Sequence, residues 1–385
     1  MNRPLALGGV RRPVIKIGSA VLRDGPDFDR VTFASLVRGV VALRAHGLEP
    51  VIVCSGAVAL GMPPLGLTAR PDRIEVLQAT AAVGQGRLMR MWADELGHYG
   101  AVPAQVLLTH DDLRDRRRFL AARHTLRALL ELGAVPVINE NDTVATEEIK
   151  MGDNDLLSSQ VTSLVEGQLL VILSDVEGFY AGDPRAEGAR PEPWVERIDE
   201  RVLDLAGGST TGLGSGGMRT KLEAVRQVNR LGVPAIIARG KTPQVLRRLY
   251  DGEALGTWFA PETATIGRRK HWIAYALRPA GTLRVDAGAV DALVRRGRSL
   301  LPIGITAVEG DFGPGETVRI VGPDGEEVAR GLAGHDAATL RALAGRRTAA
   351  AETLDRAPPE AVHRDDLVLL RGPVDAAEPP GGADP

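Results

Sequence analysis

The sequence predicts an α/β fold, a three-layer αβα sandwich with a mainly parallel sheet, followed by a small β-rich domain. Between residues 13 and 260, short apolar runs alternate with longer segments of helical periodicity. The apolar runs carry valine, isoleucine and leucine at successive positions, so both faces would be buried, as in a parallel sheet covered by helices. Glycines follow four helical segments, where helices commonly end: Gly47, Gly133, Gly167 and Gly232.

The elements can be placed in order along the chain. The expected strands are Val14–Ile17, Pro50–Cys54, Val102–Leu107, Val135–Ile138, Leu169–Leu173 and Pro234–Ala238. The expected helices are Asp29–Ala45, Asp72–Leu96, Asp111–Leu132, Asp155–Glu166 and Met218–Leu231. Short β-type runs then follow: Thr282–Val285, Thr317–Val321, Val328–Leu332 and Leu367–Leu370. We expect an extension (1–12), a first domain (13–276), a linker (277–281), a second domain (282–373) and a flexible tail (374–385).

The composition is that of an ordinary globular protein. The chain has 385 residues, 44% of them hydrophobic, and a net charge of −2. No run approaches the roughly 18 apolar residues of a membrane span, and no secretory signal is apparent. The single cysteine, Cys54, excludes an intrachain disulfide and fits a reducing compartment, so we expect a cytoplasmic location.

The densest polar run spans residues 139–155, directly after the expected strand Val135–Ile138. Two clusters of carboxylate and amide side chains flank Lys150 in this run. Because buried charges without partners are costly, we expect the run to face solvent or a ligand. Its chemistry suits amines, phosphates and a divalent metal.

Lysine is rare in this chain, since only five of the 47 basic residues are lysines. Lys16, Lys150 and Lys221 each lie in a polar or glycine-rich motif, where a compact ammonium is not replaceable by a planar guanidinium. Lys241 and Lys270 require no such explanation.

Three loops that follow strands are candidate sites, because ligands of open parallel sheets bind at the carboxyl ends of strands. Lys16 with Gly18 can meet phosphate oxygens, although an ordinary turn explains the pair equally well. Ser55 begins a glycine turn that could hold an anion or be a plain βα turn. Ser174 and Asp175 could contact a nucleotide or form a surface turn.

The segment 207–221 is more specific. It contains six glycines and opens directly into a helical pattern that carries Lys221 in its first turn. Glycine-rich backbone at a helix start binds anions, which favours a phosphate site over a flexible linker. Two phosphate-directed lysines, a glycine cradle and several carboxylates, without a nucleophile–base pair, are typical of phosphoryl transfer.

Taken together, these motifs resemble those of the glutamate 5-kinases of the amino acid kinase superfamily, over roughly residues 13–372. The matching motifs are Val14–Ser19, Ser55–Ala57, Ala82–Gln85, Arg118–Leu120, Val135–Asp142, Glu148–Asp155, Gly212–Met218 and Val362–Asp366. The resemblance implies the amino acid kinase fold with a C-terminal PUA domain. It also implies transfer of the ATP γ-phosphate to the side-chain carboxylate of L-glutamate, the first step of proline biosynthesis.

The resemblance also assigns roles to residues. Lys16 and Lys221 would neutralise the transferring phosphoryl group, and Asp155 would orient both lysines. The glutamate-binding residues would be Ser55, Asp142 and Asn154, with Asp153 and Lys150 nearby. The nucleotide site would be lined by Lys16, Gly18, Ser174, Asp175, Ser215, Gly216, Gly217, Met218, Arg219, Thr220 and Lys221. ATP is the implied co-substrate, and Mg²⁺ would bridge its phosphates without identified protein ligands.

The family suggests a dimer or tetramer and feedback inhibition by L-proline, at or overlapping the glutamate site. PUA domains often bind RNA, but residues 281–356 carry ten arginines, no lysine and eleven acidic residues. A nucleic-acid surface usually needs a clustered positive footprint, so we expect assembly or regulation here and not RNA binding.

Three rival interpretations remain. One is a superfamily kinase acting on aspartate, carbamate, acetylglutamate or UMP, which the run 139–155 disfavours. Another is an RNA-binding protein built around the PUA domain, which the neutral charge balance disfavours. The third is a sensor without catalysis, disfavoured because Lys16, Lys221 and Asp155 are all present.

Overall fold

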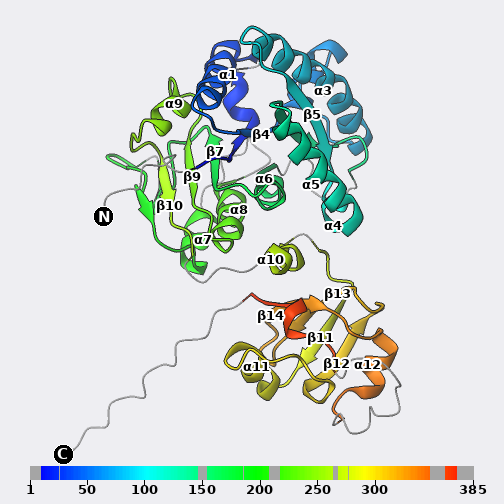
Figure 1. Ribbon diagram of the computed structural model, residues 1–385. Helices are drawn as coiled ribbons and strands as arrows, with labels where there is room; N and C mark the ends of the chain where they lie inside the picture. Colours follow the sequence, from blue (N-terminus) through cyan, green and yellow to red (C-terminus); the bar gives the residue numbers. More distant parts are fainter. Residues whose placement is uncertain are drawn as a thin grey trace, which may run out of the picture. The chain divides into compact units, whose positions relative to one another are not determined.

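The computed structural model describes residues 10–25, 27–145, 154–184, 186–207, 217–262, 268–275, 277–346 and 360–370. The chain divides into two compact units, Met1–Thr265 and Ile266–Pro385, each described here by itself (Figure 1). The division comes earlier in the chain than the linker expected at residues 277–281. Helix α10 (Arg268–Tyr275) therefore falls in the second unit and not in the first. No helix in the described ranges is long and apolar enough to cross a membrane.

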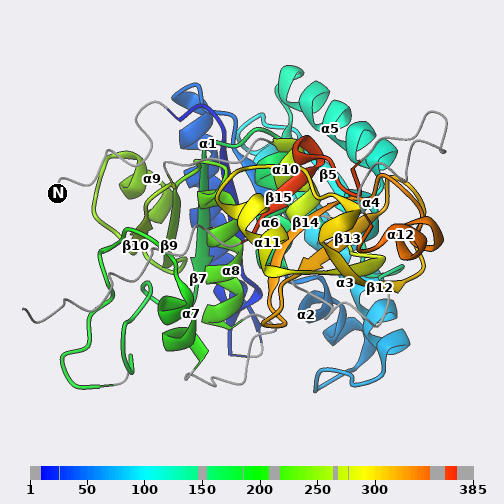
Figure 2. The ribbon, with the colours of Figure 1, turned by 90° about the horizontal axis from the view of Figure 1, so that it is seen from below.

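Within the described residues, the first unit is built on an eight-stranded sheet with the order β5-β6-β4-β1-β7-β9-β10-β8. Its strands are β1 (Pro13–Ile17), β4 (Val51–Cys54), β5 (Pro103–Leu108), β6 (Val135–Glu140), β7 (Leu169–Ser174), β8 (Trp194–Val195), β9 (Ala235–Arg239) and β10 (Thr257–Phe259). All neighbouring pairs are parallel except β9 and β10, which confirms the mainly parallel sheet. The succession β10, β9, β7 can be followed in Figure 2.

Helices cover both faces of this sheet, as predicted (Figure 1). One face packs on α1 (Arg30–Ala45), α3 (Ile74–Gly97) and α9 (Val245–Tyr250). The other packs on α4 (His110–Arg114), α5 (Arg116–Glu131), α6 (Asn154–Leu164), α7 (Glu200–Gly207) and α8 (Met218–Asn229). The two hydrophobic cores are separate clusters on opposite faces of the sheet, which makes the three layers.

Side-chain alternation along β1 sets the direction of its lysine. Ile15 and Ile17 belong to the core under α1 and α3, whereas Val14 belongs to the core under α5, α6 and α8. Because successive side chains of a strand point to opposite faces, Lys16 shares the face of Val14. The lysine is therefore aimed at the layer that contains α6 and α8.

Two expectations from the sequence are wrong in detail. The single helix expected over Asp111–Leu132 is two helices, because Asp115 adopts an extended conformation and caps α5 by accepting a hydrogen bond from the Arg118 amide. Strand β6 also continues beyond Ile138 to Glu140, since Asn139 and Glu140 pair with Leu107 and Leu108 of β5.

The second unit contains a five-stranded sheet with the order β12-β11-β13-β14-β15 in the part that the structure describes. Its strands are β11 (Gly281–Val285), β12 (Ile305–Gly310), β13 (Thr317–Val321), β14 (Glu327–Leu332) and β15 (Leu367–Leu369). Helices α11 (Ala287–Val294) and α12 (Ala337–Leu343) contribute Leu293 and Leu340 to its core. The β-rich character is as predicted, although β12 was not expected.

Candidate active site

The polar loops of the first unit meet at one edge of the sheet, where the parallel strands end. Strand β1 is central, with β4 and β6 on one side and β7 and β9 on the other. The Ser55 amide donates to the Ile17 carbonyl, and the Gly18 amide donates to the Leu173 carbonyl, both at 3.1 Å. The turn after β1 is thus fixed between two half-sites, at the position where the strand order reverses and ligands commonly bind.

Three charged side chains converge at this turn. Lys16 Nζ lies 2.5 Å from Asp155 Oδ1, and Lys221 Nζ lies 3.2 Å from Asp155 Oδ2. The residues come from β1, from the first turn of α6 and from the first turn of α8. One carboxylate therefore holds two ammonium groups on the face of the sheet that α6 and α8 cover.

This cluster is buried. The side chains of Lys16, Lys221 and Asp155 are 7%, 9% and 2% exposed. Burial raises the pKa of Asp155, but the two lysines outweigh it and hold that pKa below its usual value. The cluster brings two ammonium groups together on one carboxylate, and paired ammonium groups of this kind are suited to binding the oxygens of a phosphoryl group.

The start of α8 completes the cluster. Thr220 Oγ1 donates to Asp155 Oδ2 at 3.1 Å and also contacts the Gly217 carbonyl at 2.9 Å. Met218 packs on the apolar core instead, and Arg219 pairs with Glu223 and Asp204. Of the predicted nucleotide residues in this segment, Thr220 and Lys221 join the charged cluster, whereas Ser215 and Gly216 lie outside the described residues.

On the β7 side of the turn, Ser174 and Asp175 follow the strand as expected. Ser174 is buried, its hydroxyl lies 2.9 Å from Asp175 Oδ1, and Asp175 is exposed. A Cβ atom added to Gly18 would lie 3.4 Å from the Leu173 carbonyl oxygen and 3.7 Å from Lys16 Nζ. Both are ordinary van der Waals distances, so the space at this position does not itself require glycine.

On the β4 side, amide and hydroxyl groups are linked. Asn154 Nδ2 donates to Ser55 Oγ at 2.8 Å and to Asn139 Oδ1 at 3.0 Å. The run 139–155 was expected to face solvent or a ligand, and its described residues differ in exposure. Asn139, Glu140, Asn154 and Asp155 are only 1–3% exposed, whereas Thr143 and Val144 are exposed.

Asp142 lies at the outer end of the same side. It is 9% exposed, and burial raises its pKa to about 6. Among the described residues its Oδ1 atom has no hydrogen-bond partner. Lys150 and Asp153, also predicted to lie near the substrate, fall outside the described residues.

Comparison with known proteins agrees with this geometry. The sequence pattern of the Amino acid kinase family matches residues 11–239, and that of the PUA domain matches residues 281–353. A protein of Pseudomonas putida (strain W619) named glutamate 5-kinase is 51% identical over 366 residues, covering 94% of this chain and 98% of that relative. This chain belongs to the amino acid kinase family, among the glutamate 5-kinases.

Two further glutamate 5-kinases show that the similarity extends beyond one lineage. The protein of Ectopseudomonas mendocina (strain ymp) is 50% identical over 368 residues, covering 94% of this chain and 98% of its own length. That of Trichlorobacter lovleyi (strain ATCC BAA-1151 / DSM 17278 / SZ) is 49% identical over 374 residues, covering 96% and 99%. These alignments include most of the first unit (Met1–Thr265, the kinase unit) and of the second unit (Ile266–Pro385, the PUA unit).

Gln85 is a polar residue near the site that was not among the predicted site residues. Gln85, on α3, accepts a hydrogen bond from Asn139 Nδ2 at 2.8 Å. Helix α3 reaches the site because it packs backbone to backbone on the short helix α2 (Ala57–Gly61) that follows Ser55. A Cβ atom on Gly84 would lie 1.7 Å from the Ala57 carbonyl oxygen, so only glycine permits this approach. In the sequence, Gln85 could have been found through the motif Ala82–Gln85, which is one of those that resemble the glutamate 5-kinases.

A metal site made by the chain itself is not apparent in the described residues, since no three His, Cys, Asp or Glu side chains lie together as ligands. The one carboxylate at the centre, Asp155, is engaged by two lysines. Magnesium is often bound by substrate phosphates with only one or two protein carboxylates. The residues therefore fit Mg²⁺ as an ion that enters with the nucleotide.

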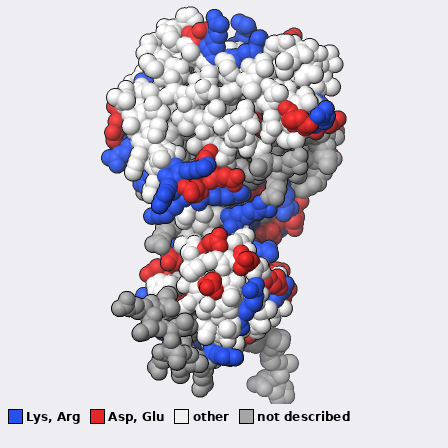
Figure 3. All heavy atoms as spheres, turned by 90° about the vertical axis from the view of Figure 1, so that its right-hand side faces the viewer, with Lys and Arg blue, Asp and Glu red and all other residues white. Residues whose placement is uncertain are grey.

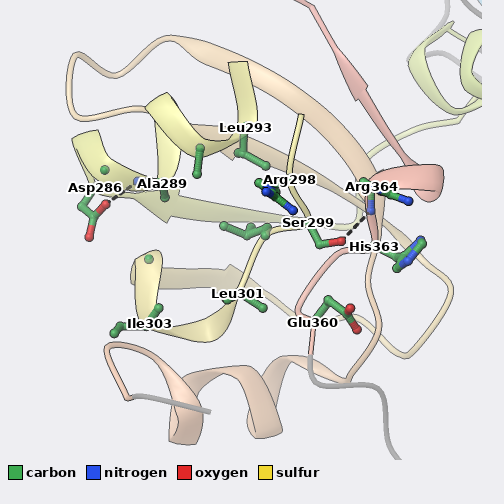
Figure 4. Close-up of a pocket in the computed structure, with 14 residues that line it drawn as sticks. Asp286, Ala289, Leu293, Arg298, Ser299, Leu301, Ile303, Glu360, His363 and Arg364 are labelled. Carbon is green, nitrogen blue, oxygen red and sulfur yellow. Dashed lines mark hydrogen bonds between the residues drawn. The ribbon is translucent and has the colours of Figure 1, made fainter. Parts of the chain in front are cut away.

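The PUA unit has a pocket of about 600 Å³ of its own (Figure 4). Helix α11 and the segment Arg298–Gly304 line one part, and Glu360, His363 and Arg364 line another. Its lining includes Asp286 and Glu360 as well as Arg298 and Arg364, so side chains of both charges line it. On the face in Figure 3 the acidic and basic side chains of this unit are interspersed.

Proposed function

We propose that this chain transfers the γ-phosphate of ATP to the side-chain carboxylate of L-glutamate, giving L-glutamyl 5-phosphate and ADP. The product would enter proline biosynthesis. The observation that carries the proposal is the buried Lys16–Asp155–Lys221 cluster, which brings two ammonium groups together at the edge of the sheet where ligands bind. The name of the relatives and the family agree with it.

The reaction brings two anions together, so neutralising charge is the main task. Lys16 and Lys221 would bind the transferring phosphoryl oxygens, and Asp155 would hold both ammonium groups in place, with support from Thr220. The attacking carboxylate is already ionised at neutral pH, so no general base is needed. Magnesium bound to ATP would neutralise further phosphate charge.

The two sides of the β1 turn divide the substrates. We assign the β4 and β6 side, with Ser55, Asn154 and Asp142, to L-glutamate, because it offers acceptors suited to an α-ammonium group. The β7 side, with Ser174 and Asp175, and the start of α8 are assigned to ATP. Lys16 lies between them, where phosphate must pass from one substrate to the other.

The test is an assay with ATP, Mg²⁺ and L-glutamate, in which hydroxylamine traps the acyl phosphate as a hydroxamate. We expect hydroxamate that depends on L-glutamate, and none with L-aspartate or without an acceptor. Hydroxamate with L-aspartate alone would assign the chain to another acceptor. ATP binding without any product would indicate a sensing role.

We further propose that L-proline competes with L-glutamate, because both amino acids present an α-carboxylate and an ammonium group to the same side chains. The expected result is a rise in the apparent KM for L-glutamate at constant kcat when L-proline is added. Inhibition that lowers kcat alone would place L-proline elsewhere. A homo-oligomer, dimer or tetramer, remains our proposal, and sedimentation velocity of the full chain would test it.

For the PUA unit we propose a role in assembly or regulation and not in RNA binding. Four of the eight arginines described in residues 281–346 are paired with acidic groups within the unit: Arg284 with Glu309, Arg295 and Arg296 with Asp291, and Arg330 with Glu327. Paired charges present little net field to a phosphate backbone. Salt-dependent binding of a generic RNA probe to the full chain would contradict this proposal.

A further inference from the structure

A chain of side-chain amides runs through the glutamate side of the site. Its members come from four places: the loop after β4 (Ser55), α6 (Asn154), β6 (Asn139) and α3 (Gln85). The contacts are Asn154 Nδ2 to Ser55 Oγ at 2.8 Å, Asn154 Nδ2 to Asn139 Oδ1 at 3.0 Å and Asn139 Nδ2 to Gln85 Oε1 at 2.8 Å. We call these four residues the amide relay.

One backbone group fixes the direction of every bond in the amide relay. The Glu140 backbone N–H donates to Asn139 Oδ1 at 2.9 Å, so that atom must be the carbonyl oxygen of the Asn139 side chain. Asn139 Nδ2 is then the donor towards Gln85, whose facing atom must be the acceptor Oε1. The Asn154 atom facing Asn139 Oδ1 must likewise be the donor Nδ2. The orientations of the amides are thus set by the hydrogen-bond network and are not interchangeable.

Two polar atoms of the amide relay remain without a partner, and one is a donor while the other is an acceptor. Gln85 Nε2, a donor, and Asn154 Oδ1, an acceptor, are buried and have no hydrogen-bond partner among the described residues. Asp142 Oδ1 is another buried acceptor of the same kind. Buried polar atoms are nearly always hydrogen-bonded. We therefore expect these three atoms to bind a ligand that has both hydrogen-bond donors and acceptors. The α-ammonium and α-carboxylate of an amino acid supply both.

The position of Gln85 is fixed by packing and does not depend on the ligand. Gly84 meets the Ala57 carbonyl of α2, and on the same helix Gln78 Nε2 donates to the Ala145 carbonyl at 2.8 Å. Helix α3 is therefore held at two places along the glutamate side, with Gln85 between β6 and α2. A recognition residue should be pre-organised in this way.

We propose that Gln85 is a further substrate-recognition residue, whose Nε2 group donates a hydrogen bond to the α-carboxylate of the amino-acid substrate. This inference rests on the proposed function. The α-carboxylate is chosen because the reacting γ-carboxylate must lie near Lys16, and Asn154 adjoins Asp155 at that end of the relay. Gln85 is at the opposite end, beyond Asn139. Gln85 would therefore contact the α-carboxylate end of the substrate, which takes no part in the reaction.

The decisive variant is Gln85→Glu in the full chain. Glutamate at this position keeps an oxygen that accepts from Asn139 Nδ2, but it replaces the free donor by an acceptor. A purely structural role would let this variant lower the free energy of unfolding, because it buries a carboxylate, but would leave the KM for L-glutamate near that of the wild type. If Gln85 binds the α-carboxylate, the KM for L-glutamate should rise roughly 10- to 100-fold, the range for a hydrogen bond to a charged group. The kcat should change little and the KM for ATP not at all, since the contact is equal in ground and transition states.

Two further variants separate the loss of the hydrogen-bond donor from the effect of the added charge and from general effects of a Gln→Glu change. Gln85→Met, which adds no charge but removes both the Nε2 donor and the Oε1 acceptor of Asn139 Nδ2, should raise the KM for L-glutamate in the same direction and by a smaller factor. Gln168→Glu is the matched control, because Gln168 Oε1 accepts from the backbone amides of Arg11 and Arg12 at the opposite edge of the sheet. It should leave both KM values unchanged. A KM within twofold of wild type for Gln85→Glu, or a loss confined to kcat, would overturn the proposal.

Calorimetric titration of L-glutamate without ATP separates this inference from the proposed function. If the wild type binds L-glutamate but forms no hydroxamate, the proposed reaction fails, and the Kd values of wild type and Gln85→Glu still decide the role of Gln85. A wild-type chain that binds no L-glutamate by either measurement would overturn both.

Discussion

Lys16 Nζ lies 2.5 Å from Asp155 Oδ1, which ties the end of the central strand to the first turn of α6. The same carboxylate meets Lys221 Nζ at 3.2 Å, so the three elements that frame the reaction share one anion. All three side chains are buried, and the two ammonium groups lie between the sides of the site that we assign to ATP and to the acceptor carboxylate.

The first prediction concerns this anion. Asp155→Asn keeps the size of the side chain but removes the carboxylate that two buried ammonium groups contact, and removing one partner of a buried pair typically costs about 3–5 kcal/mol. We expect a lower free energy of unfolding and a loss of hydroxamate formation of at least roughly 100-fold, as for removal of a key electrostatic group. Denaturant unfolding and the hydroxamate assay measure these effects.

Asp251→Asn is the matched control, since Asp251 forms a half-exposed pair with Arg247. Exposed pairs contribute about 0–1 kcal/mol, so little change is expected in either measurement. Equal activity of Asp155→Asn and wild type would contradict the role given to Asp155.

The second prediction tests the choice of lysine over arginine. Lys221→Arg keeps the charge, but a planar guanidinium cannot place a compact charge beside Asp155 and the transferring phosphoryl group. We expect most turnover to be lost with only a modest rise in the Kd for ATP. Lys241→Arg is the control, because Lys241 pairs with Asp29 as a part-exposed side chain. Near-normal turnover of Lys221→Arg would refute the argument.

The third prediction follows from Asp142, whose pKa burial raises to about 6 from the ordinary 3.8. Below that pKa the carboxyl is protonated and cannot pair with the α-ammonium group of L-glutamate. We therefore expect kcat/KM for L-glutamate to rise with pH through about 6 and then level off. The KM for ATP should not follow the same curve. Asp142→Asn should raise the KM for L-glutamate and remove this step from the pH profile.

The same shift predicts the sign of a stability effect. The folded-state pKa is above the unfolded value, so the folded form binds the proton more tightly and ionisation of Asp142 opposes folding. Its contribution should lower the free energy of unfolding as pH rises from about 4 to about 6, and stay constant above. Asp142→Asn should be free of this slope. A substrate-free wild-type chain with the same pH slope as Asp142→Asn would contradict it.

Local patterns in the sequence pointed to the three residues of the charged cluster. Each can be recognised from a few neighbouring residues: Lys16 ends an apolar strand, Lys221 starts a helix after glycines, and Asp155 ends a polar run. Parallel strands bring their carboxyl ends to one edge, so the convergence follows from the fold class. The structure brings these three together as expected.

The remaining features depend on contacts between distant segments. Gln85 lies in the middle of α3, where the helical pattern continues unchanged on both sides. Only the close approach of Gly84 to Ala57 brings it to the site, and a single sequence does not reveal which glycines meet. Likewise, the burial of Asn139 and Glu140 follows from their pairing with β5, whereas the local sequence predicted only that they would face solvent or a ligand.

The last prediction tests that helix contact directly. A methyl group at Gly84 would lie 1.7 Å from the Ala57 carbonyl oxygen, so Gly84→Ala must push α3 away from α2. Overpacking of this kind costs about 1–3 kcal/mol or more, and it would also displace Gln85 and the turn that follows Ser55. We expect a lower unfolding midpoint and a higher KM for L-glutamate. Gly86→Ala, on the same helix, meets nothing within 4 Å and should instead stabilise the chain by about 0.5–1 kcal/mol, because alanine favours helix over glycine. If both variants unfold alike and bind L-glutamate alike, α2 and α3 do not set the geometry of the site.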